Sequence, residues 1–211
     1  MEAAAREARY QVLTSIHTDW LVLAHHADDQ AETLLLRLSR GAGVKGAACM
    51  RAMDAARRIV RPLLQESRAD LEAYARANQL VWVEDDSNPD QEFSRNYLRQ
   101  TVLKPLRARF PGVVKNLVRS ASLFAESDVL LGELARMDAA TVGLGQAGSR
   151  VRWLSLSPAR TRNLLRHYLV EATHEPYLPE MSRLDEGLRQ IASSVSTRWI
   201  FGSRALCAYR D

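Results

Sequence analysis

Acidic and histidine side chains crowd the segment AHHADDQAET at residues 24–33. Asp29 and Glu32 lie three residues apart, a spacing that places both carboxylates on one face of a helix. Two carboxylates beside His26 could ligate a divalent cation or bind a cationic amine. Acidic residues also stabilise a helix N-terminus through the helix dipole, and for Asp28 this structural role stays an alternative.

The flanking elements place this segment at the end of a strand. Residues 20–24, WLVLA, form a continuous apolar run, which predicts a buried parallel strand. Residues 28–40 predict a helix that Asp28 caps and that Gly41 stops. Because ligands of open α/β sheets bind outside the carboxyl ends of the strands, the segment has the position of a binding site.

Strands and helices alternate in the first part of the chain and give way to helices in the second. Further helices are predicted over residues 2–16 and 67–78, the latter with a capping-box start at Ser67 and Asp70, and strands over residues 58–62 and 81–85. After a turn-rich loop at residues 87–93, helices are predicted over residues 94–141 with a break near 110–112, from residue 158, and over 179–193. A strand at residues 151–154 and a hairpin over 197–210, turning at 202–203, complete the prediction.

These elements predict the fold class. It is an α/β protein with a partial parallel sheet of the Rossmann-like type, followed by a mostly helical domain. We place the first domain at residues 1–108 and the second at residues 109–211.

The composition is that of an ordinary globular protein. The 211 residues are 46% apolar and 26% charged, which excludes disordered, fibrous and disulfide-scaffold classes. No apolar run approaches the roughly 20 residues of a membrane span, and the N-terminus does not look like a secretory signal. Cys49 and Cys207 lie far apart, so two free thiols and a cytoplasmic location are expected.

Basic residues gather in two stretches without acidic residues, at 93–125 and 139–170. Spacings of three or four along helices would line charge on one face, as contact with RNA phosphates requires. The alternative is a solvated helix face. The candidates for RNA contact are Lys104, Arg107, Arg109, Lys115, Arg119, Arg160, Arg162 and Arg166.

Four motifs in a fixed order resemble one known family. They are EAAAREARY (residues 2–10), AHHADDQAETLLLRLSRGAG (24–43), RPLL (61–64) and DDSNPDQEFSRNYLR (85–99). Together they resemble the tRNA(Ile)-lysidine synthetases, a branch of the PP-loop ATPases. The resemblance is dense in the predicted α/β domain and loose in the remainder.

The resemblance implies an ATP-dependent ligase that modifies tRNA. Such enzymes adenylate the C2 oxygen of the wobble cytidine in an isoleucine tRNA with a CAU anticodon, and the ε-amine of L-lysine then displaces AMP to give lysidine. Substrates would be tRNA(Ile), L-lysine and ATP, with Mg²⁺ as cofactor. Asp29 and Glu32 would be catalytic, with Asp29 also the metal ligand. Supporting residues of the lysine and ATP site would be Arg6, His26, Asp28, Arg95, Asn96 and Arg99.

The sequence departs from the family at one motif. The phosphate-binding loop SGGxDS, which lies upstream of these motifs in the family, is absent. Gly41–Gly43 is no substitute, because it follows a helix and does not join a strand to a helix N-terminus. We therefore expect a fragment of a longer enzyme that is inactive alone. Whether it forms a homodimer stays open.

Two other classes are compared with the ligase. A zinc-dependent amide hydrolase with an AHPDD-x-E motif is superficially similar, but AHHADDQAE carries an extra residue before the paired aspartates. Stoichiometric, tightly bound zinc would favour that hydrolase. A stand-alone RNA-binding module is the third class, and salt-dependent tRNA binding without ATP binding would favour it.

Overall fold

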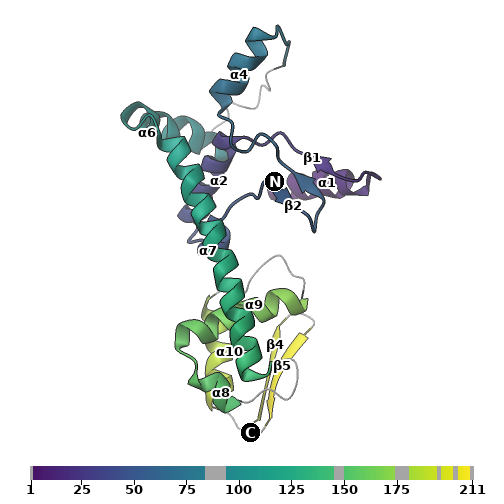
Figure 1. The fold of residues 1–211 in the computed structure, drawn as a ribbon, viewed down its shortest axis with the longest axis vertical. Helices are drawn as coiled ribbons and strands as arrows, with labels where there is room; N and C mark the ends of the chain where they lie inside the picture. The colour runs from purple at the N-terminus through teal and green to yellow at the C-terminus, as the bar shows by residue number, and fades with distance from the viewer. Residues whose placement is uncertain are drawn as a thin grey trace. The chain divides into compact units, whose positions relative to one another are not determined.

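The computed structural model describes residues 2–83, 94–144, 150–173, 181–193, 196–201 and 204–209. The chain forms two compact units, residues 1–128 and 129–211 (Figure 1). The helix α7 (Val113–Val142) crosses from one to the other. The predicted loop at residues 87–93 and the predicted turn at 202–203 lie outside the described residues. The domain boundary proposed at residue 108 lies just before α7 and stays a prediction.

The first unit contains a small mixed sheet. Its strands are β1 (Leu21–Val22), β2 (Met53–Asp54) and β3 (Ile59–Val60), in the order β1-β3-β2. The β1 and β3 strands are parallel, with Leu21 opposite Ile59, whereas β2 is antiparallel to β3. The parallel pair confirms the α/β class, and the antiparallel β2 makes the sheet mixed.

Helices account for most of the first unit. The four that precede residue 84 are α1 (Glu2–Ser15), α2 (Ala27–Ser39), α3 (Val44–Ala47) and α4 (Arg68–Ala77). From residue 94 the chain continues as α5 (Ser94–Tyr97), the π-helical segment η1 (Leu98–Leu103) and α6 (Lys104–Arg109). The break between α6 and α7 falls at residues 110–112, as predicted.

The predicted helix signals at residues 41 and 67 are confirmed. Gly41 has a φ of +73°, and the amide of Ala42 donates to the carbonyl of Arg37 at 3.0 Å, which closes α2 with a Schellman motif. Ser67 caps α4 by accepting from the amide of Asp70 at 3.1 Å.

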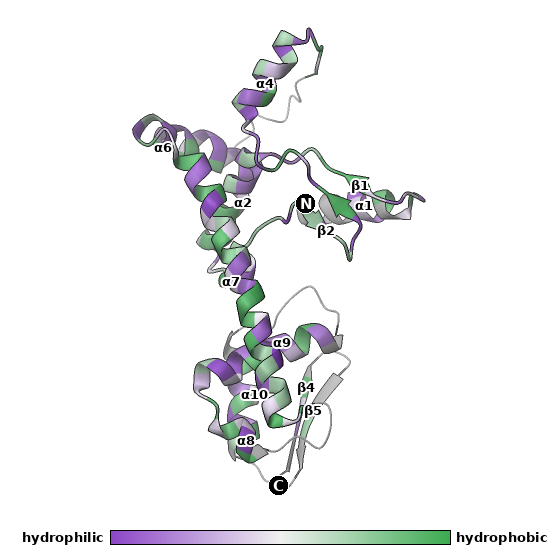
Figure 2. Ribbon diagram, viewed as in Figure 1, coloured by the Kyte–Doolittle hydropathy of each residue, from purple (hydrophilic) through white to green (hydrophobic). Residues whose placement is uncertain are grey.

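The core of the first unit joins α2 to the first half of α7. Leu34 of α2 and Ala121 of α7 are buried together with Ala47, and Leu117 and Phe124 pack against them. Figure 2 shows apolar and polar residues alternating along α2 and α7, which is typical of amphipathic helices. The acidic segment at residues 24–33 thus leads into a helix whose inner face is packed against α7.

The second unit packs helices around the end of α7 together with a hairpin. Its elements are α8 (Arg150–Ser155), α9 (Pro158–Thr173), α10 (Met181–Ser193), β4 (Ser196–Phe201) and β5 (Arg204–Tyr209). The β4 and β5 strands pair antiparallel, which confirms the predicted hairpin. Trp153, Leu164, Leu184 and Trp199 are among the buried residues of this core.

Two predicted strands are wrong. Residues 151–154 form part of α8, because a short alternation of apolar residues also fits a helical turn that buries Trp153 and exposes Val151 and Leu154. Residues 81–83 form no strand, and Val81 and Val83 are 97% and 94% exposed. Trp82, between these two valines, is also exposed.

The strand prediction at residues 20–24 and the expected cap of α2 need correction as well. Only Leu21 and Val22 pair in the sheet, and Val22 is 64% exposed because its strand lies at the edge of the described sheet. The N-cap of α2 is His26 and not Asp28. Asp28 lies two residues further along, within the first turn, where it accepts other hydrogen bonds.

A larger side chain at Gly187 would meet a buried tryptophan of the second unit. A Cβ built there would lie 2.7 Å from the Trp199 indole, whereas one at Gly132 would lie 3.6 Å from His167. We expect Gly187→Ala to destabilise the protein by about 1–3 kcal/mol in urea unfolding, because the buried indole must shift. Gly132→Ala is the matched control and should be neutral or stabilising by up to about 1 kcal/mol. Equal stability of both variants would contradict the packing described.

Candidate functional site

The acidic segment lies at the carboxyl end of the β1–β3 parallel pair. The chain leaves β1, reaches the N-cap His26 and enters α2 with Asp28 and Asp29 in the first turn. The amide of Ala27 donates to the carbonyl of Glu66 at 2.9 Å, so the start of α2 lies beside the start of α4. Three carboxylates, those of Asp28, Asp29 and Glu32, therefore emerge from one and a half turns of one helix.

Glu32 forms a bidentate ion pair with Arg99. The Glu32 side chain is fully buried. Arg99 donates from Nε to Oε1 at 2.7 Å and from Nη2 to Oε2 at 3.2 Å. The hydrogen bond to Glu32 raises the pKa of Arg99 above its ordinary value, and the charges of Asp29 and Asp28 add to this effect. The guanidinium of Arg99 therefore stays charged beside the buried carboxylate.

Arg99 lies in the π-helical segment η1, which the sequence did not reveal. A π-helical turn inserts an extra residue into each turn and is often found at functional sites. Arg95, one turn earlier, donates from Nη2 to the hydroxyl of Thr33 at 2.8 Å. Arg95 and Arg99 thus both contact α2, and their supporting roles at the site stay predictions.

Asp28 connects three helices. Its Oδ2 accepts from the amide of Arg68 at 2.8 Å, at the N-terminus of α4. Its Oδ1 accepts from Nη2 of Arg107, which lies on α6. Asp28 is buried, and its two oxygens are satisfied. Arg107, a candidate for RNA contact, is therefore an ion-pair partner of the acidic segment.

Asp29 keeps one oxygen without a partner among the described residues. Its Oδ2 accepts from the amide of His26 at 3.0 Å, which completes the N-terminal turn of α2. The Nε2 atom of His26 lies 3.5 Å from the same oxygen. The Asp29 side chain is 16% exposed. Asp29 is the carboxylate of the three that can still bind a ligand.

The remaining predicted site residues lie close by or are not fully described. Asn96 lies on α5 between Arg95 and the η1 segment. Arg6 lies on α1, and its side chain is outside the described part of the structure. The structure thus brings together His26, Asp28, Asp29, Glu32, Arg95 and Arg99.

The candidate RNA-contact residues fall into two groups. Lys104, Arg109, Lys115 and Arg119 are exposed on α6 and α7, and Arg109 stacks over Phe110 with its guanidinium carbon 5.4 Å from the ring centre. The others have partners or are half-buried: Arg107 with Asp28, Arg160 with the fully buried Asp138, Arg162 with Asp185 at 3.4 Å, and Arg166 half-buried.

The described residues were also searched for metal-binding groups, paired cysteines and membrane-spanning helices. None of their histidine, cysteine and acidic side chains form a group of three or more that is arranged to hold a metal ion. Cys49 and Cys207 are free thiols, as predicted, and burial raises the pKa of Cys49 to about 11. Across the described helices, none combines the length and the apolar character that crossing a membrane requires.

Comparison with known proteins matches both parts of the chain. Residues 1–106 match the PP-loop domain family, and residues 149–211 match the TilS substrate binding domain. A tRNA(Ile)-lysidine synthase of Aromatoleum aromaticum is 46% identical over 213 residues, covering 100% of this chain and 50% of the relative. The enzyme of that name from Azoarcus sp. is 42% identical over 215 residues, covering 100% of this chain and 47% of the relative. The chain spans about half the length of the curated relatives it matches.

The chain belongs to the PP-loop family, whose domain it matches over half its length. Within that family it belongs to the branch that carries the TilS substrate binding domain. The resemblance drawn from the four motifs is confirmed.

The described site makes Asp28 a structural centre of the first unit. We expect Asp28→Ala to lower the free energy of unfolding by roughly 3 kcal/mol, because Arg107 and the amide of Arg68 lose a buried charged acceptor. The control is Asp128→Ala, which removes a carboxylate 3.4 Å from the exposed Arg51 and should cost less than about 1 kcal/mol. Urea unfolding of both variants measures the difference, and equal losses would refute the central position of Asp28.

Proposed function

We propose that this chain carries the lysine-binding carboxylate of an ATP-dependent ligase that modifies tRNA(Ile). The reaction would adenylate the C2 oxygen of the wobble cytidine with release of pyrophosphate. The ε-amine of L-lysine would then form the new C–N bond at C2, and AMP would leave. The observation that carries the proposal is the Asp29 oxygen that has no partner among the described residues, whereas the carboxylates of Asp28 and Glu32 are each paired with an arginine.

The charges of the cluster favour a cationic ligand at Asp29. Asp28 and Glu32 are each neutralised by an arginine, Arg107 and Arg99. Among the described residues, Asp29 has hydrogen-bond or ion-pair contacts only with the amide and the imidazole of His26, and Arg99, which pairs with Glu32, acts on it only through its charge. The negative charge of Asp29 is therefore less fully neutralised than those of Asp28 and Glu32. The ε-ammonium of lysine is a compact cation with three donors, which one free carboxylate oxygen can hold at low dielectric. On giving up its proton, the same amine becomes the nucleophile.

Arg99 and Arg95 would serve the nucleotide. Arg99 is held by both oxygens of Glu32, so its guanidinium has a fixed orientation, as electrostatic stabilisation of a phosphoryl group requires. Arg95 is fixed by Thr33 in the same way. Glu32 acts in this proposal through Arg99 and does not contact lysine itself.

Mg²⁺ fits the free oxygen of Asp29 as an alternative to the ammonium group. A carboxylate oxygen is a ligand that Mg²⁺ prefers, and one protein carboxylate with waters and phosphate oxygens is a usual Mg²⁺ environment. The bound ion would neutralise phosphate charge. Asp29 would hold it, with Arg95 and Arg99 flanking the phosphates.

The tRNA would lie on the exposed cations of the first unit. Lys104, Arg109, Lys115 and Arg119 are exposed, and Lys115 and Arg119 are four residues apart on α7. These side chains can bind phosphates without breaking an ion pair, whereas Arg107 and Arg160 would each leave a buried carboxylate unpaired. We therefore assign RNA contact to the four exposed residues.

Asp29→Asn tests the proposed lysine site. The change removes the charge and keeps the size, so we expect lysidine formation by the full-length protein to fall roughly 100-fold or more. The affinity for tRNA should change less than about threefold, because no phosphate contact is lost. Asp70→Asn, on the exposed start of α4, is the control. Unchanged turnover in Asp29→Asn would refute the assignment.

Salt-dependent tRNA binding with neither ATP binding nor lysidine formation in the wild type would favour a stand-alone RNA-binding module.

The exposed pair on α7 tests the RNA assignment. In Lys115→Gln/Arg119→Gln, the slope of log affinity for tRNA against log salt should decrease by about 1.5, since each lost phosphate contact contributes about 0.7–0.9. The control Arg68→Gln/Arg76→Gln removes the same charge from α4, where both side chains pair with Glu72. Filter binding between 50 and roughly 300 mM salt gives the slopes. Identical slopes for wild type and the α7 variant would remove these residues from the interface.

A further inference from the structure

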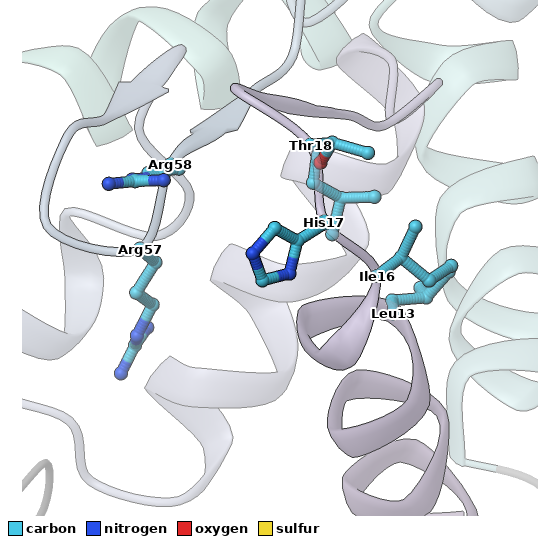
Figure 3. A pocket seen from close by; sticks show the side chains of 7 residues that line it. Leu13, Ile16, His17, Thr18, Arg57 and Arg58 are labelled. Carbon is cyan, nitrogen blue, oxygen red and sulfur yellow. The ribbon is translucent and has the colours of Figure 1, made fainter.

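A pocket of about 220 Å³ with a basic lining lies away from the acidic segment. It is formed by the end of α1 and the residues that follow it, the start of β1, and the turn between β2 and β3. In Figure 3 the His17 ring lies between Arg57 and Arg58 on one side and the aliphatic Leu13 and Ile16 on the other. The volume is below the roughly 300–1,000 Å³ of sites for whole small molecules, so the pocket fits a single small group.

The pocket lies at the opposite end of the parallel strands from the carboxylates. Leu21 is the first residue of β1, and Arg58 directly precedes Ile59, its register partner on β3. Both residues therefore mark the amino end of this strand pair. The carboxylates of Asp28, Asp29 and Glu32 follow the carboxyl end of β1. A ligand of the pocket is thus separate from the lysine and ATP site.

The charges of the pocket favour an anion. Its lining contains two arginines and a histidine and no acidic residue among the described side chains. Arg57 has a weak ion pair, with Nη1 3.7 Å from Asp54, and is 65% exposed. No hydrogen bond or ion pair of the described part involves the side chain of His17 or of Arg58. The hydroxyl of Thr18 adds another donor at the rim.

The backbone holds Arg58 in an unusual conformation. Its φ is +52°, a left-handed value that is uncommon for a residue with a side chain. The conformation is fixed on both sides, because the carbonyl of Arg58 accepts from the amide of Leu21 at 2.7 Å and its amide donates to Ala55 at 3.3 Å. Such a residue persists only where its surroundings determine it, and these are often ligand contacts.

We propose that His17, Arg57 and Arg58 bind a phosphate oxyanion, and that its source is a backbone phosphodiester of the RNA substrate. The planar fork of an arginine matches two phosphate oxygens, and the lining offers two adjacent arginines, a hydroxyl and an imidazole as donors. The choice of RNA as the source rests on the proposed function. The pocket would add an RNA contact at the end of the parallel strands opposite the carboxylates. A free phosphate ion has the same chemistry, and the experiment separates the two.

The test compares tRNA binding and phosphate binding by the full-length protein. In Arg58→Gln, the slope of log tRNA affinity against log salt should decrease by about one, because one phosphate contact is lost. Arg58→Lys keeps the charge and should restore most of the slope. The control Arg40→Gln removes an exposed arginine at the end of α2 and should leave the slope unchanged. Thermal melting of each variant verifies folding, and line broadening of inorganic phosphate in ³¹P NMR reports free-ion binding.

Several outcomes would overturn the proposal. An unchanged slope in a folded Arg58→Gln variant would do so, and so would loss of inorganic phosphate binding while tRNA affinity stays the same. Turnover separates this proposal from the function proposed above. At saturating tRNA, Arg58→Gln should form lysidine at the wild-type rate. If the wild type forms no lysidine but binds tRNA with a slope that Arg58 controls, the ligase proposal fails and the pocket proposal stands.

Discussion

The bidentate pair between Glu32 and Arg99 is the interaction on which the rest of the site depends. A carboxylate with no solvent exposure must be neutralised and hydrogen-bonded, because an unpaired buried charge costs several kcal/mol. Arg99 meets both demands by donating to the two oxygens from two nitrogens. For this contact to form, η1 must lie across α2, and this brings Arg95 to Thr33 one turn earlier. One ion pair thereby sets the position of the residues around it.

A second consequence is that the three carboxylates have different environments. Glu32 and Asp28 each have an arginine, and Asp28 also accepts the first amide of α4. Asp29 accepts a hydrogen bond from the amide of His26 with its Oδ2, and its Oδ1 has no partner among the described residues. Two of the three neighbouring carboxylates are therefore paired with arginines, and Asp29 is the one to which our proposal assigns the ligand. This division explains how a helix N-terminus can be both stabilised and functional, two interpretations that the sequence left as alternatives for Asp28.

Local signals in the sequence predicted much of the fold. Gly41, the cap at Ser67 and the break at residues 110–112 act within a few residues, so they can be recognised without tertiary contacts. The strand expected at residues 151–154 failed because a short apolar alternation fits both a strand and one turn of helix. The candidate site residues were predicted from the four family motifs and from the place of the acidic segment at the end of a strand. The partners of Arg107 and Arg160 could not be predicted, because a basic residue paired across 79 or 22 positions of sequence looks the same as one that faces solvent.

A double-mutant cycle on Glu32 and Arg99 tests most directly whether this pair organises the site. Unfolding free energies are measured for the wild type, Glu32→Gln, Arg99→Gln and the double variant. Each single change leaves one charged partner buried or partly buried, so we expect a coupling energy of about 2 kcal/mol or more. Single changes whose effects add to within about 0.5 kcal/mol would show that the two side chains act independently, and would contradict the central position of the pair.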